Sequence, residues 1–207
     1  MTLTDAEARL QAFTALLRRW NSTLNLIAPR DVDVLWERHI ADSLQLVPLM
    51  PPGVARGIDL GSGGGFPGLV LAIATGVPFD LIESDRRKAS FLRTAVLETQ
   101  APASVHCCRI EQAAVPPAPL VTVRALAPLP RLLPMVARLL AADGTCLLLK
   151  GAKVQEELEA AGRDWAMTVE RTPSRTSADG VVLRLANLRP QPEQGPGQAG
   201  PMPGEAP

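Results

Sequence analysis

A glycine-rich turn constrains this chain more than any other stretch. Residues 59–68 read Asp-Leu-Gly-Ser-Gly-Gly-Gly-Phe-Pro-Gly, between an apolar run that predicts a strand and an apolar run that predicts a helix. Glycine takes positive φ easily and leaves the backbone uncovered, while the N–H groups that begin a helix point at whatever lies before it. A tight turn alone needs only one or two glycines. We therefore expect a ligand to approach the backbone at Gly61, Gly63 and Gly65.

The spacing of these glycines distinguishes between ligands. The dinucleotide fingerprint needs Gly or Ala three residues after Gly63, where this chain has Phe66. What remains is an acid, Asp59, two residues before a Gly-x-Gly-x-Gly turn. This form resembles motif I of the class I S-adenosylmethionine-dependent methyltransferases. The alternative is that the glycines only make a tight turn.

Composition narrows the class of protein. The chain has 207 residues, of which 46% are apolar, enough for one domain with a real core. Cys107, Cys108 and Cys146 lie in apolar runs without a metal-ligand spacing, so neither disulfides nor a metal site are expected. The sequence shows no secretory signal and no apolar run long enough to cross a bilayer. It therefore predicts a cytoplasmic protein that does not associate with a membrane.

Charge says little about partners at the level of the whole chain. Lys plus Arg and Asp plus Glu are equal, at 21 each. A surface for nucleic acid must therefore be local.

The chain divides into three parts. A helical N-terminal cap is expected over residues 1–50, with one helix at 5–20 and another that begins with Asp31 as its N-cap and runs to about Val47. Residues 51–189 alternate strands and helices. Residues 190–207 are rich in Pro and Gly and predict a disordered tail.

The alternating region predicts a mostly parallel sheet covered by helices, with an antiparallel last strand. Strands are expected at 57–60, 78–83, 104–111, 120–125, 145–150, 167–170 and 181–186.

Charged residues stand at the carboxyl ends of four of these strands. They are Asp59, Glu83, Glu111 and Arg124. Ligands of open α/β sheets bind outside those ends, so the four should face one crevice. Glu83 also lies where nucleotide-binding sheets place the acid that accepts hydrogen bonds from ribose hydroxyls.

Basic residues near this edge are candidates for RNA phosphates. Arg86, Arg87 and Lys88 fall in the first turn of a helix, where they oppose its dipole, although a merely solvated face fits equally well. In the cap, Arg38 and Asp42 are four residues apart, as are His39 and Ser43. By themselves these pairs favour a surface ion pair and a hydrogen-bonded histidine.

With these residues in hand, the chain resembles the bacterial 16S ribosomal RNA guanine-N7 methyltransferase family, called RsmG or GidB. The similarity runs from about Phe13 to Leu188 and rests on motifs in register. They are W-N-x-x-x-N-L at 20–26, R-H-x-x-D-S-L at 38–44, the glycine turn with its Phe-Pro-Gly ending, R-I-E at 109–111, R-A at 124–125 and K-G at 150–151.

The resemblance implies an S-adenosylmethionine cofactor and 16S rRNA, or a small-subunit particle, as partner of a monomeric enzyme. Gly61 and Phe66 would line the cofactor, Glu83 would hold its ribose, Ile110 and Glu111 its adenine, and Arg124 its methionine end. It also implies that the segment with Arg38 and His39, like Lys150, touches RNA or cofactor. Where many members have an Arg-His pair, this chain has Asp179-Gly180, so no function is carried over there.

The chemistry of guanine N7 implies catalysis by positioning. N7 has a lone pair and no hydrogen, so no general base is needed, and Arg124 and His39 are the candidates for alignment. Two rivals remain: a nicotinamide-dependent dehydrogenase, disfavoured by Phe66, and a non-catalytic RNA-binding or assembly protein. Titration with S-adenosylhomocysteine against NAD tests the first, and labelled methyl transfer to rRNA tests the second.

Overall fold

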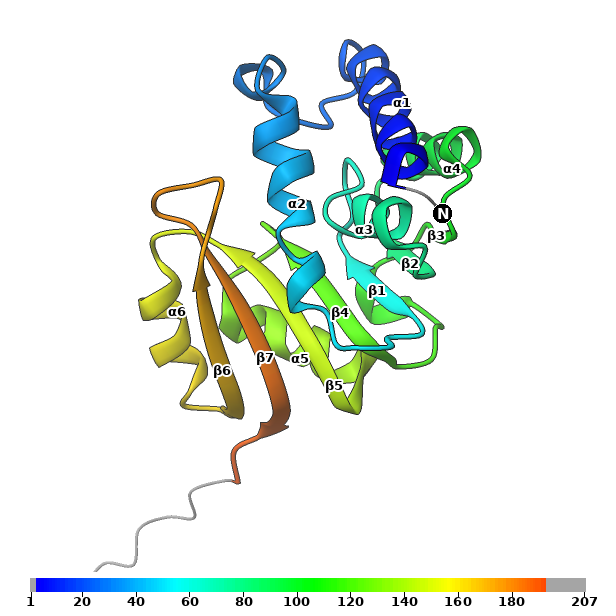
Figure 1. Ribbon diagram of the computed structural model, residues 1–207. Helices are drawn as coiled ribbons and strands as arrows, with labels where there is room; N and C mark the ends of the chain where they lie inside the picture. The colour runs from blue at the N-terminus through cyan, green and yellow to red at the C-terminus, as the bar shows by residue number, and fades with distance from the viewer. Residues whose placement is uncertain (1–2, 193–207) are drawn as a thin grey trace, which may run out of the picture.

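A computed structural model describes residues 3–192 of the chain as a seven-stranded sheet of order β3-β2-β1-β4-β5-β7-β6 (Figure 1). The strands are β1 (Gly57–Leu60), β2 (Phe79–Ile82), β3 (Ala103–His106), β4 (Ala118–Arg124), β5 (Leu140–Lys150), β6 (Trp165–Pro173) and β7 (Val181–Pro190). All pairs from β3 to β5 are parallel, and β7 is antiparallel to both of its neighbours. The predicted fold class is confirmed.

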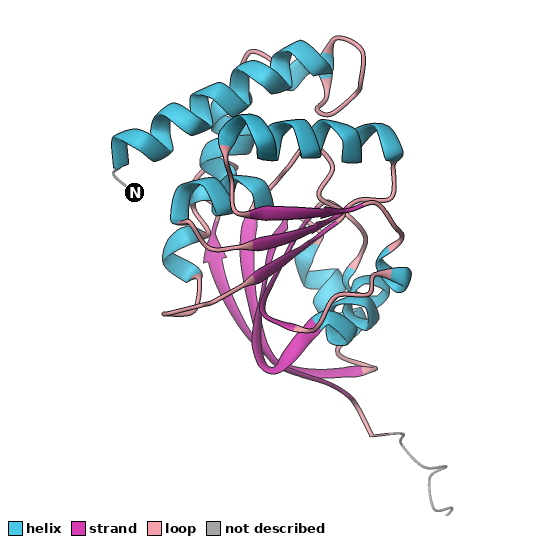
Figure 2. Cartoon of the chain, turned by 90° about the vertical axis from the view of Figure 1, so that its right-hand side faces the viewer, coloured by secondary structure: helices cyan, strands magenta, loops and turns pink. Residues whose placement is uncertain are grey.

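Helices cover both faces of the sheet, as the edge-on view shows (Figure 2). They are α1 (Leu3–Asn21), α2 (Asp42–Leu44), α3 (Gly68–Thr75), α4 (Arg86–Thr99), α5 (Leu129–Leu139) and α6 (Val154–Ala161). Three short 3-10 helices, η1 (Pro29–Asp31), η3 (Val47–Leu49) and η4 (Ile110–Gln112), and the π-helix η2 (Trp36–Ala41), which continues into α2, complete the set.

The core has two halves because side chains alternate along each strand. In β5, Leu147 and Leu149 join the core half under α1, α3 and α4, whereas Cys146 and Leu148 join the half under α5 and α6. A strand buried on both faces reads as a continuous apolar run, which is why the sequence reveals it so clearly.

The N-terminal helix α1 is part of the first core half. The ring of Phe13 lies 5.7 Å from that of Phe66 after the glycine turn and 6.2 Å from that of Phe91 on α4. The cap therefore packs directly on the elements that shape the site.

Two expected elements are wrong in part. The third strand ends at His106 rather than Glu111, because Cys108 begins a turn and Ile110–Gln112 form the 3-10 helix η4. Glu111 therefore follows the sheet edge on a loop.

The second cap helix is also shorter than expected. Asp31 closes η1 and caps no helix, and η2 begins only at Trp36. The Arg38–Asp42 pair does not form either, because Asp42 pairs with Arg124.

The remaining expectations on organisation are settled only in part. Within residues 3–192, no helix is long and apolar enough to cross a membrane. The predicted tail lies outside the described residues from 193 onward, and β7 continues to Pro190.

Candidate active site

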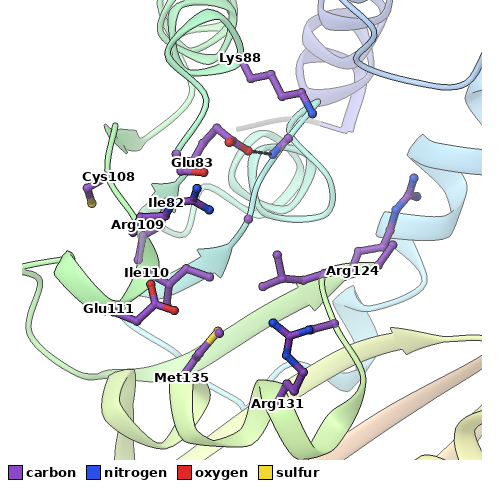
Figure 3. Close-up of a pocket in the computed structure, with 16 residues that line it drawn as sticks. Ile82, Glu83, Lys88, Cys108, Arg109, Ile110, Glu111, Arg124, Arg131 and Met135 are labelled. Atoms are coloured by element: carbon purple, nitrogen blue, oxygen red, sulfur yellow. Dashed lines mark hydrogen bonds between the residues drawn. The ribbon is translucent and has the colours of Figure 1, made fainter.

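A cavity of about 460 Å³ opens at the carboxyl ends of the parallel strands (Figure 3). This is the position that ligands of open α/β sheets take, and the volume suits a small molecule. The lining residues are Gly61, Gly63, Ile82, Glu83, Ser84, Lys88, Cys108, Arg109, Ile110, Glu111, Arg124, Ala125, Leu126, Ala127, Arg131 and Met135. We call it the first pocket.

The glycine turn forms one wall of the first pocket. Gly61 and Gly63 have φ of +67° and +53°, which side chains other than glycine rarely adopt. A Cβ on Gly63 would meet only the carbonyl oxygen of Gly61, 3.7 Å away, whereas a Cβ on Gly61 would come within 2.7 Å of the Leu126 side chain. The backbone at Gly63 is therefore bare toward the pocket, and Leu126 packs over Gly61.

Glu83 is fixed at the end of β2 by backbone donors. The Gly63 N–H donates to its Oε2 at 2.9 Å and the Asp85 N–H donates to its Oε1 at 2.7 Å. Figure 3 shows this carboxylate beside the glycine turn and above Ile110. A carboxylate oxygen has lone pairs left after one such bond, so Glu83 can still accept from the hydroxyls of a ribose.

The structure brings together six of the nine residues expected to bind the cofactor. Gly61, Gly63, Glu83, Ile110, Glu111 and Arg124 line the first pocket, while Asp59, Gly65 and Phe66 lie outside the lining. The expectation that Asp59 faces the crevice is wrong, because it is fully buried and accepts a hydrogen bond of 2.7 Å from Thr122. Burial raises the pKa of the Asp59 carboxyl to about 6.

Phe66 instead carries a stack that joins the turn to the cap. The His39 ring lies on Phe66 with centroids 4.8 Å apart, and the Arg124 guanidinium carbon lies 5.1 Å from the same ring. Arg124 also donates to Asp42 Oδ2 at 3.0 Å and to the Arg38 carbonyl at 3.1 Å. Its guanidinium therefore points away from α5 toward the cap, as Figure 3 shows.

His39 is neutral in this stack. Burial, and next the nearby Arg124, lower its pKa from 6.5 to about 4. Its Nδ1 faces the Arg124 guanidinium, which can only donate, so the ring proton is on Nε2. His39 Nε2 is buried without an aligned hydrogen bond, although Asp31 Oδ2 lies 3.4 Å away.

A second pocket of about 250 Å³ adjoins the first. The two share Arg124 and Ala125. The second pocket is lined by Asp31, Arg38, His39, Asp42, Arg124, Ala125, Leu149, Lys150, Gly151, Ser174, Ser177, Gly180 and Val181.

The basic residues expected to touch RNA differ in how free they are. Arg38 and Arg86 are exposed. Arg87 is also exposed, but it donates to the Thr23 carbonyl at 2.7 Å, and Lys88 turns into the first pocket. Lys150 is less free to bind RNA, because its ammonium already donates hydrogen bonds to Glu157 and to the Ala127 carbonyl.

Sequence reasoning did not identify one part of the second pocket, the loop before β7. The Gln45 side chain accepts from the Arg175 N–H at 2.9 Å, and Thr176 donates to Asp42 at 2.6 Å, so this loop closes over the second pocket. No motif marks it, and Asp179-Gly180 gave no signal. Arg109 and Arg131 in the first pocket were missed as well. Among residues 3–192 no cluster of metal-ligating side chains occurs.

The fold and the glycine-walled pocket define a class I S-adenosylmethionine-dependent methyltransferase. Solved structures of this fold agree. An O-methyltransferase from Bacillus cereus, solved in complex with SAH, aligns with a TM-score of 0.54 at 13% identity, covering 90% of this chain and 92% of that one. A putative O-methyltransferase from Klebsiella pneumoniae aligns with a TM-score of 0.58 at 15% identity, covering 86% and 90%.

The chain belongs to the GidB family, described as rRNA small subunit methyltransferase G, which it matches over residues 6–181. Ribosomal RNA small subunit methyltransferase G of Acidiphilium cryptum is 54% identical, over 87% of this chain and 84% of that protein. The enzyme of the same name from Gluconobacter oxydans is 51% identical, over 89% and 95%. The resemblance noted in the sequence is confirmed.

Proposed function

We propose that this chain transfers the methyl group of S-adenosylmethionine to N7 of a guanine in small-subunit (16S) ribosomal RNA. The main support for this proposal is the position of Arg124, because its side chain lines both the first pocket, which is large enough for the cofactor, and the smaller second pocket beside it. A donor and an acceptor held in two adjoining pockets can meet at this shared wall.

The residues of the first pocket fit the cofactor. The bare backbone at Gly63 leaves room for the methionine part, and Glu83 offers a fixed carboxylate to ribose hydroxyls. Ile110 and Glu111 offer an apolar surface and an acceptor to the adenine. When bound, S-adenosylmethionine supplies a methyl group on a positively charged sulfur.

The acceptor needs no base from the protein. Guanine N7 has a free lone pair and no hydrogen, so the contribution of the chain is to orient the two partners and exclude water. His39 suits this task, because its Nδ1 is occupied by Arg124 and its ring is held on Phe66. We assign no general-base role to Asp59, Glu83, Glu111 or His39.

RNA binding is local on this account. Arg38 beside the second pocket and Arg86 at the start of α4 are exposed cations near the sheet edge that holds both pockets. Their charges can meet phosphates without a basic surface overall. Acting on ribosomal RNA, the chain works in the cytoplasm, and a single chain supplies both pockets, so a monomer suffices.

Two measurements on the full chain test the proposal. Calorimetric titration should show binding of S-adenosylhomocysteine and none of NAD. Labelled methyl from S-adenosylmethionine should then appear as N7-methylguanosine in small-subunit rRNA, supplied both naked and as particles from cells lacking this protein. Cofactor binding without any transfer to either substrate would favour a non-catalytic RNA-binding protein.

A further inference from the structure

Asp31 occupies a special place in the second pocket. Pro29 starts the turn η1, which ends at Asp31 and directs its carboxylate toward His39 and the pocket. The His39 ring lies between Asp31 and Arg124, with Nδ1 toward Arg124 and Nε2 toward Asp31. Asp31 therefore stands one imidazole ring away from the wall that the two pockets share.

Of the two carboxylates in this pocket, only Asp31 has unused hydrogen-bonding capacity. Asp42 accepts from Arg124 on one oxygen and from Gln45 and Thr176 on the other. Within residues 3–192, by contrast, no donor hydrogen-bonds to the Asp31 carboxylate, although its side chain is only 15% exposed; the exposed Arg30 guanidinium lies 3.9 Å from its Oδ1, beyond hydrogen-bond distance. A carboxylate so far removed from water gains strongly from donors that a ligand brings.

A second observation points the same way. His39 is 95% buried by area, since 5% of it is exposed, and its Nε2 lacks an aligned partner although Asp31 Oδ2 lies 3.4 Å away. The ring N–H on Nε2 therefore faces Asp31 without forming an aligned hydrogen bond to it. The Asp31–His39 pair is thus an acceptor facing a cavity.

We propose that Asp31 selects guanine, by accepting hydrogen bonds from N1–H and the 2-amino group of the target base. This inference rests on the proposed function. The N1 edge of a purine lies on the side of the base away from N7, so a base with N7 at the Arg124 wall turns this edge toward the interior of the second pocket. Guanine presents two adjacent donors there, matching a carboxylate, whereas adenine presents an acceptor at N1 and no amino group at C2.

The test compares two acceptors in single-turnover methylation at saturating cofactor. One is small-subunit rRNA with its methylated guanosine, and the other carries inosine at that nucleotide, introduced by ligation. Inosine keeps N7 and N1–H but lacks the 2-amino group. Wild type should methylate guanosine about 10-fold faster or more, the size of one hydrogen bond to a charged group. In Asp31→Ala, and in Asp31→Asn as the milder variant, the ratio should fall to near one.

The ratio separates base reading from a structural role. If Asp31 only supported His39, both acceptors would slow equally and the ratio would stay at the wild-type value, which would overturn the inference. A wild-type ratio near one would overturn it too. Asp33→Asn, an exposed carboxylate two residues away, should keep the wild-type ratio. Failure of wild type to methylate any guanine N7 would instead contradict the proposed function.

Discussion

Arg124 Nη1 lies 3.0 Å from Asp42 Oδ2, an ion pair that joins the end of β4 to the cap across 82 residues of sequence. Both side chains are mostly buried, at 18% and 16% exposed. The same guanidinium contacts His39 and lies against Phe66. This pair thus fixes the wall between the two pockets.

Removing the charge of Asp42 should therefore harm alignment more than cofactor binding. We expect Asp42→Asn to lower the free energy of unfolding by about 1–3 kcal/mol, since it leaves a partly buried cation under-paired. The single-turnover rate should fall at least 10-fold, about 1.4 kcal/mol in the barrier, with little change in S-adenosylhomocysteine affinity. Urea unfolding, rapid-quench methylation and calorimetry measure the three. Glu37→Gln, an exposed carboxyl in η2, is the control, and an equal loss there would refute the role of the pair.

The glycine turn can be tested against a second glycine of similar backbone. Gly63 and Gly76 both have positive φ, at +53° and +75°, and neither Cβ would clash, but only Gly63 lines the first pocket. Alanine at either site should cost similar stability, roughly 1 kcal/mol. Only Gly63→Ala should also weaken S-adenosylhomocysteine binding, by 10-fold or more on calorimetric titration. Equal affinities in the two variants would make the turn purely structural.

RNA affinity should depend on the exposed cation Arg86. Arg86→Glu removes one phosphate contact, so we expect weaker binding of small-subunit rRNA and a shallower dependence of log K on log salt, by about one unit of slope. Filter binding from 50 to 300 mM salt measures both. Arg163→Glu makes the same charge change in the exposed loop before β6, at the opposite edge of the sheet. If the two variants lose the same RNA affinity, the loss reflects the change in net charge, and the prediction of a phosphate contact at Arg86 is wrong.

The lowered pKa of His39 makes a prediction about pH. Since the folded pKa is about 4 and the ordinary value is 6.5, the unfolded chain takes up the proton first as pH falls. The contribution of His39 to stability is therefore complete above about 6.5 and is lost as pH falls toward 4. His39→Gln should remove this part of the pH dependence of unfolding.

The same pKa predicts a flat rate profile. With RNA and cofactor saturating, single-turnover methylation should not change between pH 6 and 8, because His39 stays neutral and N7 has no proton to lose. A rate that falls with one group of pKa near 6.5, and that His39→Gln abolishes with both affinities intact, would make His39 a base.

Much of the sheet could be predicted because its central strands β1, β2, β4 and β5 contain apolar runs buried on both faces. The glycine turn identifies the ligand edge of the sheet without any long-range information. Glu111 was misplaced because the run from Ser104 through Cys108 looks like one long strand, whereas the chain turns after His106. Asp31 was expected to cap a helix, since Asp directly before an apolar-periodic stretch is a common start signal.

The second pocket could not be predicted, because its contacts join distant segments. Arg124 reaches Asp42 and His39 from β4, and Gln45 meets Arg175 across 130 residues. Such pairings depend on how distant segments pack in the folded chain. The local sequence pattern can therefore indicate candidate residues but not their partners. The role of Asp59 was misjudged for the same reason, because Thr122 on β4 takes its carboxylate out of the crevice.

The most direct test is to map N7-methylguanosine in small-subunit rRNA by borohydride and aniline cleavage. RNA would come from cells lacking this protein, and from the same cells carrying wild type, Gly63→Ala or Gly76→Ala. We predict that one cleavage site is absent without the protein, returns with wild type and with Gly76→Ala, and is reduced with Gly63→Ala. A cleavage pattern that is identical with and without the protein would contradict the account.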